Sequence, residues 1–321
     1  MNESIMSKMG SSILPRNKVN VLKRLTRDII KNKAIYLIAL PGIMYYIIYY
    51  YWPMLGVTIA FKSFVASKGV FGSPWIGLEH FVNFFKSYYF TRILRNTLVI
   101  SFYSIVIGFP APIILALLLN EVRNQVFKRV VQTVTYMPHF ISVVVVSGMI
   151  IAFTQKQGLF NDVLSVLGVP RENWLLNADW FRAIFVGSDI WQEIGWGSII
   201  YLAALTGIDS SLYEAAKIDG AGRWKQLIHI TLPGLLPTII ILLILRMGFV
   251  MNVGFEKVIL LYSPSTYEKA DVISSFVYRK GIIEANYSYA TAVGFFNSAV
   301  NFIFLLSANK LSKKYSESSL F

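Results

Sequence analysis

The stretch YEAAKIDGAGRWKQLIHITLPGLLPT, Tyr213–Thr238, joins two apolar segments that are each long enough to cross a bilayer. A connection between two membrane helices need not be this long. Glu214-Ala215-Ala216 begins a helical segment whose small residues allow a partner to come close. Asp219-Gly220-Ala221 supplies a turn, because glycine relieves the steric limit on the backbone.

The second half of this stretch predicts another helix. Trp224, Leu227 and Ile228 form an apolar face at positions i, i+3 and i+4. Leu232-Pro233 is expected to end this helix and to direct the chain back into the membrane. The pattern therefore predicts a helix–turn–helix on the cytoplasmic face, with one surface free to dock.

The whole chain is rich in apolar residues. Of its 321 residues, 55% are hydrophobic and 15% are charged, against about 25% charged in an average soluble domain. This balance excludes an ordinary soluble protein and a disordered one. The absence of cysteine excludes disulfides, a thiol nucleophile and a cysteine-based metal site. The histidines, His80, His139 and His229, are too far apart in sequence to predict a metal site, and no catalytic residue is expected.

Six segments reach the roughly 20 residues that a membrane helix needs. Backbone groups in lipid must bond within the protein, so these segments are expected to be helices and the predicted fold is an all-α polytopic membrane protein. The segments are Ala34–Phe61, Ile93–Asn120, Val130–Phe153, Ala183–Thr206, Gly234–Tyr262 and Ser288–Ala308.

The positions of lysine and arginine predict the orientation. The segments outside the spans form two sets, one with 17 Lys and Arg in 82 residues and the other with 10 in 85. The richer set includes both termini and should be cytoplasmic, which explains most of the net charge of +13 without nucleic acid. Residues 19–33 are expected to form an amphipathic helix on the inner membrane surface. The predicted organisation is a basic segment (1–33), a membrane domain (34–308) with its docking loop at 213–237, and a cytoplasmic tail (309–321).

The loop resembles that of a known family. Glu-Ala-Ala at 214–216, Gly220, Ile230 and Leu232-Pro233 match the EAA loop of binding-protein-dependent ABC importer permeases. The flanking Asp219, Ala221 and Pro237 look like the sugar-importer branch of that family. Within the branch, residues 251–302 are similar to permeases for plant or algal polysaccharide fragments such as pectin. The resemblance covers about residues 34–310.

This resemblance implies a type I importer fold in a bacterial cell membrane and a mechanism that needs several chains. A second, homologous permease would pair with this one, and two cytoplasmic ATPase subunits would bind below. An extracytoplasmic lipoprotein would deliver the sugar. The EAA loop would be the coupling helix that seats in a cleft of the ATPase. Since the chain has no G-x-x-x-x-G-K-[ST] motif, ATP and Mg²⁺ are expected on the ATPase subunits and no cofactor is expected here.

Charged residues at membrane depth are costly, and they usually face a cavity or a partner. Asp189 and Glu193 lie four residues apart in the fourth span, on one face with Trp196. Arg246 is expected at a similar depth in the fifth span, with Lys257 on nearly the same helical face. Two interpretations stay open. Arg246 pairs with Glu193, with Asp189 or with the partner permease, or Arg246 and Lys257 form a positive stripe that favours acidic sugars.

Aromatic and polar side chains complete the predicted substrate path. Trp191 and Trp196 offer faces for pyranose rings, while Asn252 and Glu256 offer hydrogen bonds to hydroxyls. The expected function is import of oligosaccharides, with acidic fragments of polysaccharides preferred. A secondary transporter or a channel for a small polar solute is the alternative, and it would leave the EAA loop unexplained.

Overall fold

The computed structural model describes residues 30–315, which divide between two compact units, Met1–Gly56 and Val57–Phe321. The predicted amphipathic segment 19–33 lies almost wholly outside the described residues. In the first unit, α2 (Lys33–Tyr46) continues through a π-helical turn, η1 (Ile47–Tyr51), into α3 (Trp52–Met54). None of the residues in these three elements is buried within this unit.

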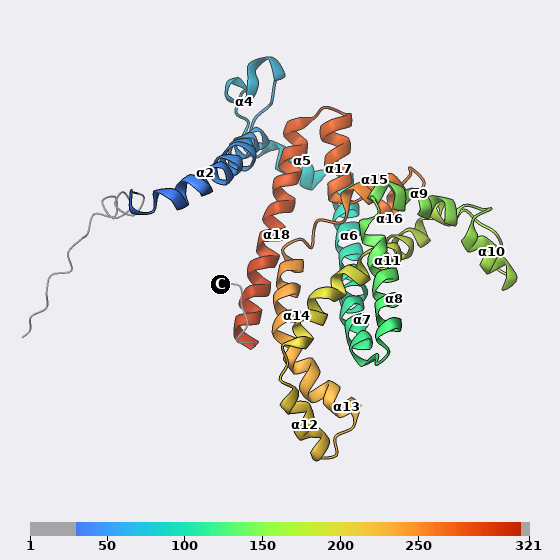
Figure 1. Ribbon diagram of the computed structural model, residues 1–321. Helices are drawn as coiled ribbons and strands as arrows, with labels where there is room; N and C mark the ends of the chain where they lie inside the picture. Colours follow the sequence, from blue (N-terminus) through green and yellow to red (C-terminus); the bar gives the residue numbers. More distant parts are fainter. Residues whose placement is uncertain (1–29, 316–321) are drawn as a thin grey trace, which may run out of the picture. The chain divides into compact units, whose positions relative to one another are not determined.

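The described part of the second unit is helical, apart from an isolated antiparallel bridge between Lys62 and Trp75 (Figure 1). A 3₁₀ segment, η2 (Leu55–Phe61), leads into it. The further elements are η3 (Ala66–Lys68), α4 (Gly69–Gly72), α5 (Glu79–Lys86), α6 (Tyr88–Tyr103), η4 (Ser104–Gly108), α7 (Pro110–Glu121), α8 (Gln125–Tyr136), η5 (Met137–Phe140), α9 (Val143–Thr154), α10 (Leu159–Val166), η6 (Trp174–Leu176), α11 (Ala178–Thr206), α12 (Ser210–Ile218), α13 (Arg223–Gln226), η7 (Leu227–Thr231), α14 (Leu232–Met247), α15 (Phe255–Leu261), α16 (Tyr267–Ala270), α17 (Ile273–Tyr278), η8 (Arg279–Ile283) and α18 (Tyr287–Tyr315).

Five helices in the described chain are long and apolar enough to cross a membrane. They are Lys33–Phe61, Tyr88–Glu121, Val143–Val166, Arg223–Met247 and Tyr287–Lys314, and each overlaps one of the predicted spans. The remaining predicted span, Ala183–Thr206, lies within α11, a single helix of 29 residues. That helix is long enough to cross, but it carries several charged and amide side chains. The count of six spans therefore stays a prediction.

The predicted span Val130–Phe153 is not one continuous helix. α8 ends at Tyr136, and a 3₁₀ turn that contains Pro138 separates it from α9. The expectation of a continuous helix is wrong here, because proline cannot donate the hydrogen bond that a helix interior requires. Hydropathy reports apolarity and does not register such a break.

Three π-helical turns each end two residues before a proline. η1 precedes Pro53, η4 precedes Pro110 and η7 precedes Pro233. In each, the residue before the proline donates its N–H to the carbonyl five residues earlier. A proline ring collides with the carbonyl four residues back, and the wider turn relieves that collision, so the helix continues. For this reason the expectation that Leu232-Pro233 ends a helix is wrong, and α13, η7 and α14 follow one another without a loop.

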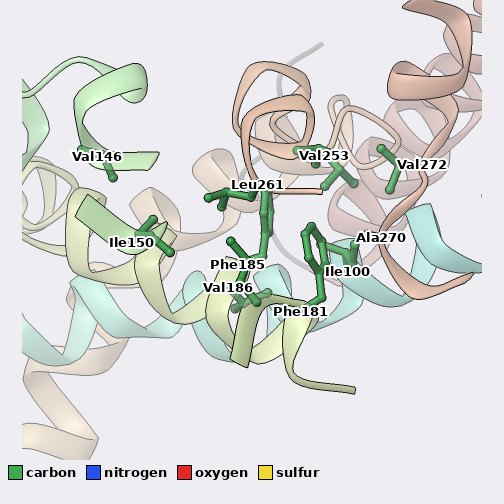
Figure 2. Packing of buried hydrophobic residues seen from close by; sticks show 12 residues of the cluster. Ile100, Val146, Ile150, Phe181, Phe185, Val186, Val253, Leu261, Ala270 and Val272 are labelled. Atoms are coloured by element: carbon green, nitrogen blue, oxygen red, sulfur yellow. The ribbon is translucent and has the colours of Figure 1, made fainter. Parts of the chain in front are cut away.

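The largest buried cluster gathers around α11. Phe181, Phe185 and Val186 of this helix pack with side chains from α6, α9, α15 and the segment around Val272 (Figure 2). Lipid tails are as apolar as these side chains, so close packing rather than exclusion from water holds the helices together. This packing fixes α11 in the middle of the second unit.

A buried acid organises the predicted outer side of the unit. The Asp271 side chain is fully buried and accepts hydrogen bonds from Arg279 Nη2 at 2.7 Å, Arg92 Nη2 at 3.3 Å and Ser275 Oγ at 2.9 Å. Burial alone would lower the pKa of the Arg279 guanidinium, but the hydrogen bonds and the charge of Asp271 raise it above its ordinary value. The network ties α6 to α17 by charge as well as by packing.

Two helices, α8 and α11, approach each other closely at Gly195 of α11. A Cβ added there would lie 2.0 Å from the backbone oxygen of Thr135 in α8. A Cβ added at Gly187, two turns earlier on the same helix, would meet nothing within 4 Å. Glycine at 195 is therefore required for packing, while glycine at 187 is not.

We predict that Gly195→Ala destabilises the protein by about 1–3 kcal/mol or more, because a rigid backbone rather than a flexible side chain opposes the new methyl group. The measurement is the midpoint of thermal unfolding of the purified transporter in detergent. Gly187→Ala is the matched control and should leave the midpoint unchanged. Equal midpoints for the two variants would contradict the assigned contact.

Candidate functional site

The EAA stretch folds into α12, a turn and α13. The carboxylate of Asp209 accepts the N–H of Ser211 at 2.9 Å, which caps α12 and lowers the pKa of Asp209. Gly220 ends the helix with φ of +74°, in the left-handed region. The N–H of Ala221 reaches the carbonyl of Ala216 at 2.8 Å, and that of Gly220 reaches Lys217 at 3.1 Å. This double closure is a Schellman motif, which favours glycine at this position, and it accounts for the predicted turn.

Several contacts make this element stiff. The Tyr213 hydroxyl lies 3.0 Å from Oγ1 of Thr231, and Gln226 Nε2 donates to the Ala221 carbonyl at 2.8 Å. A Cβ at Gly234 would come within 2.7 Å of the Ile208 side chain, so the start of α14 lies directly against the segment that leads into α12. The helix–turn–helix is therefore held to its two flanking helices and can transmit a displacement.

One surface of the helix–turn–helix formed by α12 and α13 is exposed in the described chain. Ile218 is 87% exposed and Trp224 is 78% exposed, and the Leu212 and Ile228 side chains are more than half exposed. Glu214 is exposed beside them and has no hydrogen bond or ion pair within residues 30–315. Figure 1 shows α12 and α13 projecting beyond the end of α7. Exposed apolar residues of this size beside a free acid mark a surface for another protein.

The predicted fifth span breaks at the next part of the site. α14 ends at Met247 and α15 begins only at Phe255. The expectations that Arg246 and Lys257 share one helical face, and that Asn252 and Glu256 are i, i+4 neighbours on one helix, are therefore wrong. The break itself is polar, because the Asn252 Oδ1 accepts from Asn297 at 2.8 Å and from Asn301 at 3.3 Å, both on α18.

A cavity of about 190 Å³ lies beside this break. Asp189 of α11, Arg246 of α14 and Asn252 line it, together with the hydroxyls of Ser101 and Ser104. The structure thus brings Arg246 and Asn252 to one cavity, as the predicted path requires. It does not pair Arg246 with an acid: no ion pair of Arg246 occurs in the described part of the chain, and its expected pairing with Glu193 or Asp189 is absent there.

Each acid of α11 has a different partner from the one expected. Asp189 Oδ1 lies 3.7 Å from the ammonium of Lys257, which is only 4% exposed and has no hydrogen-bond partner among residues 30–315. The same ammonium lies 5.4 Å from the centre of the Phe185 ring. Lys257 thus joins α15 to α11 through a buried charge.

Glu193 belongs to an aromatic cluster that the sequence did not reveal. Its Oε2 lies 2.9 Å from Nδ1 of His139, and the His139 ring stacks on Trp196 with centroids 4.5 Å apart and an angle of 2°. Phe140 meets the edge of Trp196 at 5.5 Å. His139 was set aside because no other histidine lies near it in sequence. The signal that could have found it is Pro138, since a helix break at membrane depth places polar side chains together.

The remaining predicted path residues lie elsewhere. Glu256 is exposed and has no ion pair within the described chain. Trp191 lines an apolar cavity of about 590 Å³ between α9, α10 and α11, away from Asn252 and Arg246. Residues 30–315 contain no group of three or more His, Asp or Glu side chains that could hold a metal ion.

Comparison with known proteins identifies the family of this chain. Residues 108–317 match the family described as binding-protein-dependent transport system inner membrane component. The chain belongs to this family. It is a membrane-spanning permease subunit of an ABC importer in the bacterial cell membrane rather than an enzyme. This excludes the alternative of a secondary transporter or a channel.

Three members of this permease family are similar to the chain over nearly its whole length. The polygalacturonan/rhamnogalacturonan transport system permease protein YteP of Bacillus subtilis (strain 168) is 45% identical over 93% of this chain and 94% of its own. A chain in the crystal structure of a bacterial ABC transporter involved in the import of the acidic polysaccharide alginate is 45% identical, with a TM-score of 0.85, over 91% of this chain and 99% of its own. A chain of bacterial alginate ABC transporter in complex with alginate pentasaccharide-bound periplasmic protein is 43% identical, with a TM-score of 0.86, over 92% and 100%.

We predict that Asp189→Asn destabilises the permease by about 3 kcal/mol, near the lower limit for a broken buried pair, because the Asp189 side chain is partly exposed. The double variant Asp189→Asn with Lys257→Met should recover most of that loss, since no buried charge is then left unpaired. Thermal unfolding of the four proteins of this cycle gives the coupling energy. Arg246→Met serves as the comparison and should change stability little. Additive effects of the two single variants would speak against the pair.

Proposed function

We propose that this permease imports acidic oligosaccharides and that α12 and α13 couple its movement to ATP hydrolysis. The observation that carries this proposal is the stiff helix–turn–helix whose exposed side, with Glu214, Ile218 and Trp224, has no cover within the described chain. In this proposal the surface seats in a cleft of an ATPase subunit. Residues Ala215, Ala216, Asp219, Gly220 and Ala221 shape it, and Leu232 and Pro233 carry the motion into α14.

The proposed assembly contains two permeases, two ATPase subunits and a sugar-binding lipoprotein outside the membrane. ATP and Mg²⁺ bind to the ATPase subunits. The permease has six spans with both termini in the cytoplasm, and α11 is the most polar of them. The uncovered helix α2–α3 is available for the lipid or for the second permease.

For the sugar path, two places on the chain support a role. The first is the polar cavity with Asp189, Arg246 and Asn252, in which hydroxyl and carboxylate groups of a sugar find hydrogen-bond partners. The second is the cluster of Trp196, His139 and Glu193, which offers an aromatic face beside a carboxylate. Charged groups that are exposed at membrane depth do not face lipid, which supports placing both on a water-filled path or against the partner permease.

The acidic nature of the substrate rests on relatives and on charge. The similar proteins transport polygalacturonan or rhamnogalacturonan and alginate by their names. In this chain, Arg246 faces the cavity without an acid partner in the described residues, so a uronate carboxylate would gain a charge partner there. A neutral sugar would gain only hydroxyl contacts and stacking.

The coupling role predicts the behaviour of Glu214→Lys. Since Glu214 has no partner within the described chain, the variant should insert and fold normally. It should lower ATP-driven uptake by about tenfold or more, equivalent to about 1.4 kcal/mol of lost docking free energy. The measurements are uptake and ATPase activity of the reconstituted complex. Glu172→Lys, the same charge change at an exposed residue on the predicted outer side, should keep uptake normal. Normal uptake by a well-expressed Glu214→Lys variant would refute the coupling role.

The substrate role predicts a preference that salt weakens. In proteoliposomes with the binding protein present, a galacturonate oligosaccharide should be taken up in preference to the matching galactose oligosaccharide. Raising the salt concentration should reduce that preference, because exposed charges are screened over about 10 Å at 0.1 M salt. Arg246→Gln should reduce it as well at low salt. A preference for the neutral sugar at low salt would show that Arg246 does not serve the substrate.

A further inference from the structure

A separate cavity, of about 400 Å³, lies between the first half of α11 and the end of α6 with the following η4 turn, and the proposed path does not use it. Its charged lining consists of Arg182, Lys269 and Asp179, and Tyr103 adds one hydroxyl. Arg182 Nη2 donates to Asn96 Oδ1 at 2.8 Å and Arg182 Nε to the Lys269 carbonyl at 3.3 Å. These bonds hold the guanidinium in place at the cavity and leave its Nη1 without a partner in the described residues.

This end of the cavity carries an excess of positive charge. Lys269 and Asp179 form an ion pair and largely neutralise each other. Arg182 has no such partner, and Arg95, an exposed residue of α6, directly precedes Asn96, the residue that accepts from Arg182, so a second positive charge lies near it. Neither arginine forms an ion pair within residues 30–315. An anion placed between the two would relieve the repulsion.

Below the charges the cavity is lined by carbon. Val186 and Ile190 stand at i+4 and i+8 from Arg182 on α11, so the apolar wall continues for about 12 Å at 1.5 Å per residue. Ile107 of η4 contributes to the same lining. An oligosaccharide needs hydrogen-bond partners along its length, and this wall supplies none from its Val and Ile side chains. An acyl chain needs only such a wall.

We propose that this cavity binds an anionic phospholipid of the outer leaflet, with its phosphate at Arg182 and Arg95 and one acyl chain along Val186 and Ile190. The depth agrees with this assignment, because Arg182 directly precedes the predicted fourth span at the level where headgroups lie. A cation at the interface with an apolar wall beneath it matches a phospholipid in both charge and shape.

The experiment uses the complete transporter in nanodiscs that contain equal amounts of phosphatidylglycerol and phosphatidylcholine. After release from the nanodiscs, the lipids that stay bound are identified by native mass spectrometry. Phosphatidylglycerol should be retained about tenfold over phosphatidylcholine, as expected for one or two basic contacts. Equal retention of the two lipids would overturn the proposal.

Two variants separate the charges from the wall. Arg95→Gln removes an exposed charge and should reduce the preference for phosphatidylglycerol. Gly187→Leu adds a bulky side chain to the lined wall while keeping every cation, and it should lower retention of phosphatidylglycerol. An added Cβ there meets no atom within 4 Å, and an unchanged midpoint of thermal unfolding is the check that the variant folds. Arg171→Gln, at an exposed outer arginine paired with Asp162, is the control and should retain the lipid as the parent does.

The same variants report on the competing occupants. If Gly187→Leu retains the lipid fully, the apolar wall is not an acyl-chain site and the proposal fails. If a trigalacturonate displaces the bound lipid, the arginines belong to the substrate path instead, which also overturns the proposal. Loss of the lipid in Gly187→Leu and Arg95→Gln, without displacement by trigalacturonate, supports it.

Discussion

A backbone that leaves the helical path inside a membrane must find hydrogen-bond partners in its own protein. Both breaks of this chain satisfy that constraint with side chains from neighbouring helices. Where α14 ends, Ser101 donates to the Val250 carbonyl and Asn301 accepts the N–H of Met251 at 2.8 Å. Where η5 separates α8 from α9, Gln192 donates to the Ile141 carbonyl at 3.3 Å. The polar residues that look costly in an apolar span are thus the ones that permit the breaks.

The same constraint explains where the charged side chains lie. Once the chain is broken and supported by amides and hydroxyls, the break is polar, and charged groups gather next to it. Asp189 and Lys257 lie at the break before α15, while Glu193 and His139 lie at the break before α9. Both sites use α11, which is unbroken from Ala178 to Thr206 and leads through three residues into α12. One rigid helix therefore connects the predicted outer side, both polar sites and the proposed docking surface.

The helical class, the approximate places of the membrane segments and the turn at Gly220 could be predicted from the sequence, because each depends on local apolarity or on the backbone freedom of one glycine. The charge partners could not be predicted. Counting depth along an uninterrupted helix places Arg246 opposite Glu193, whereas the break before α15 brings Lys257 to Asp189 instead. Pro233 predicts the end of a helix, but a π turn accommodates the proline and the helix continues.

A signal for the main break was present in the sequence. Asn297 and Asn301 stand one turn apart in the sixth span, and such amides in an apolar helix bond to backbone or to other amides that lack a partner. His139 is harder to find, because a single histidine has no pattern. Its role depends on stacking against Trp196, which is a property of two segments that meet only in the folded chain.

The half-exposed pair of Glu193 and His139 has a consequence for the life of the protein in the cell. A copy without its partners would present this carboxylate to hydrocarbon, at a cost of about 2.5–3.5 kcal/mol for an acid at the bilayer centre. If the partner permease covers this pair, its binding removes that cost, and the folded copy is then stabilised by mass action. The amount of this subunit that survives proteolysis is thereby tied to the amount of its partners, and stoichiometry is maintained after synthesis.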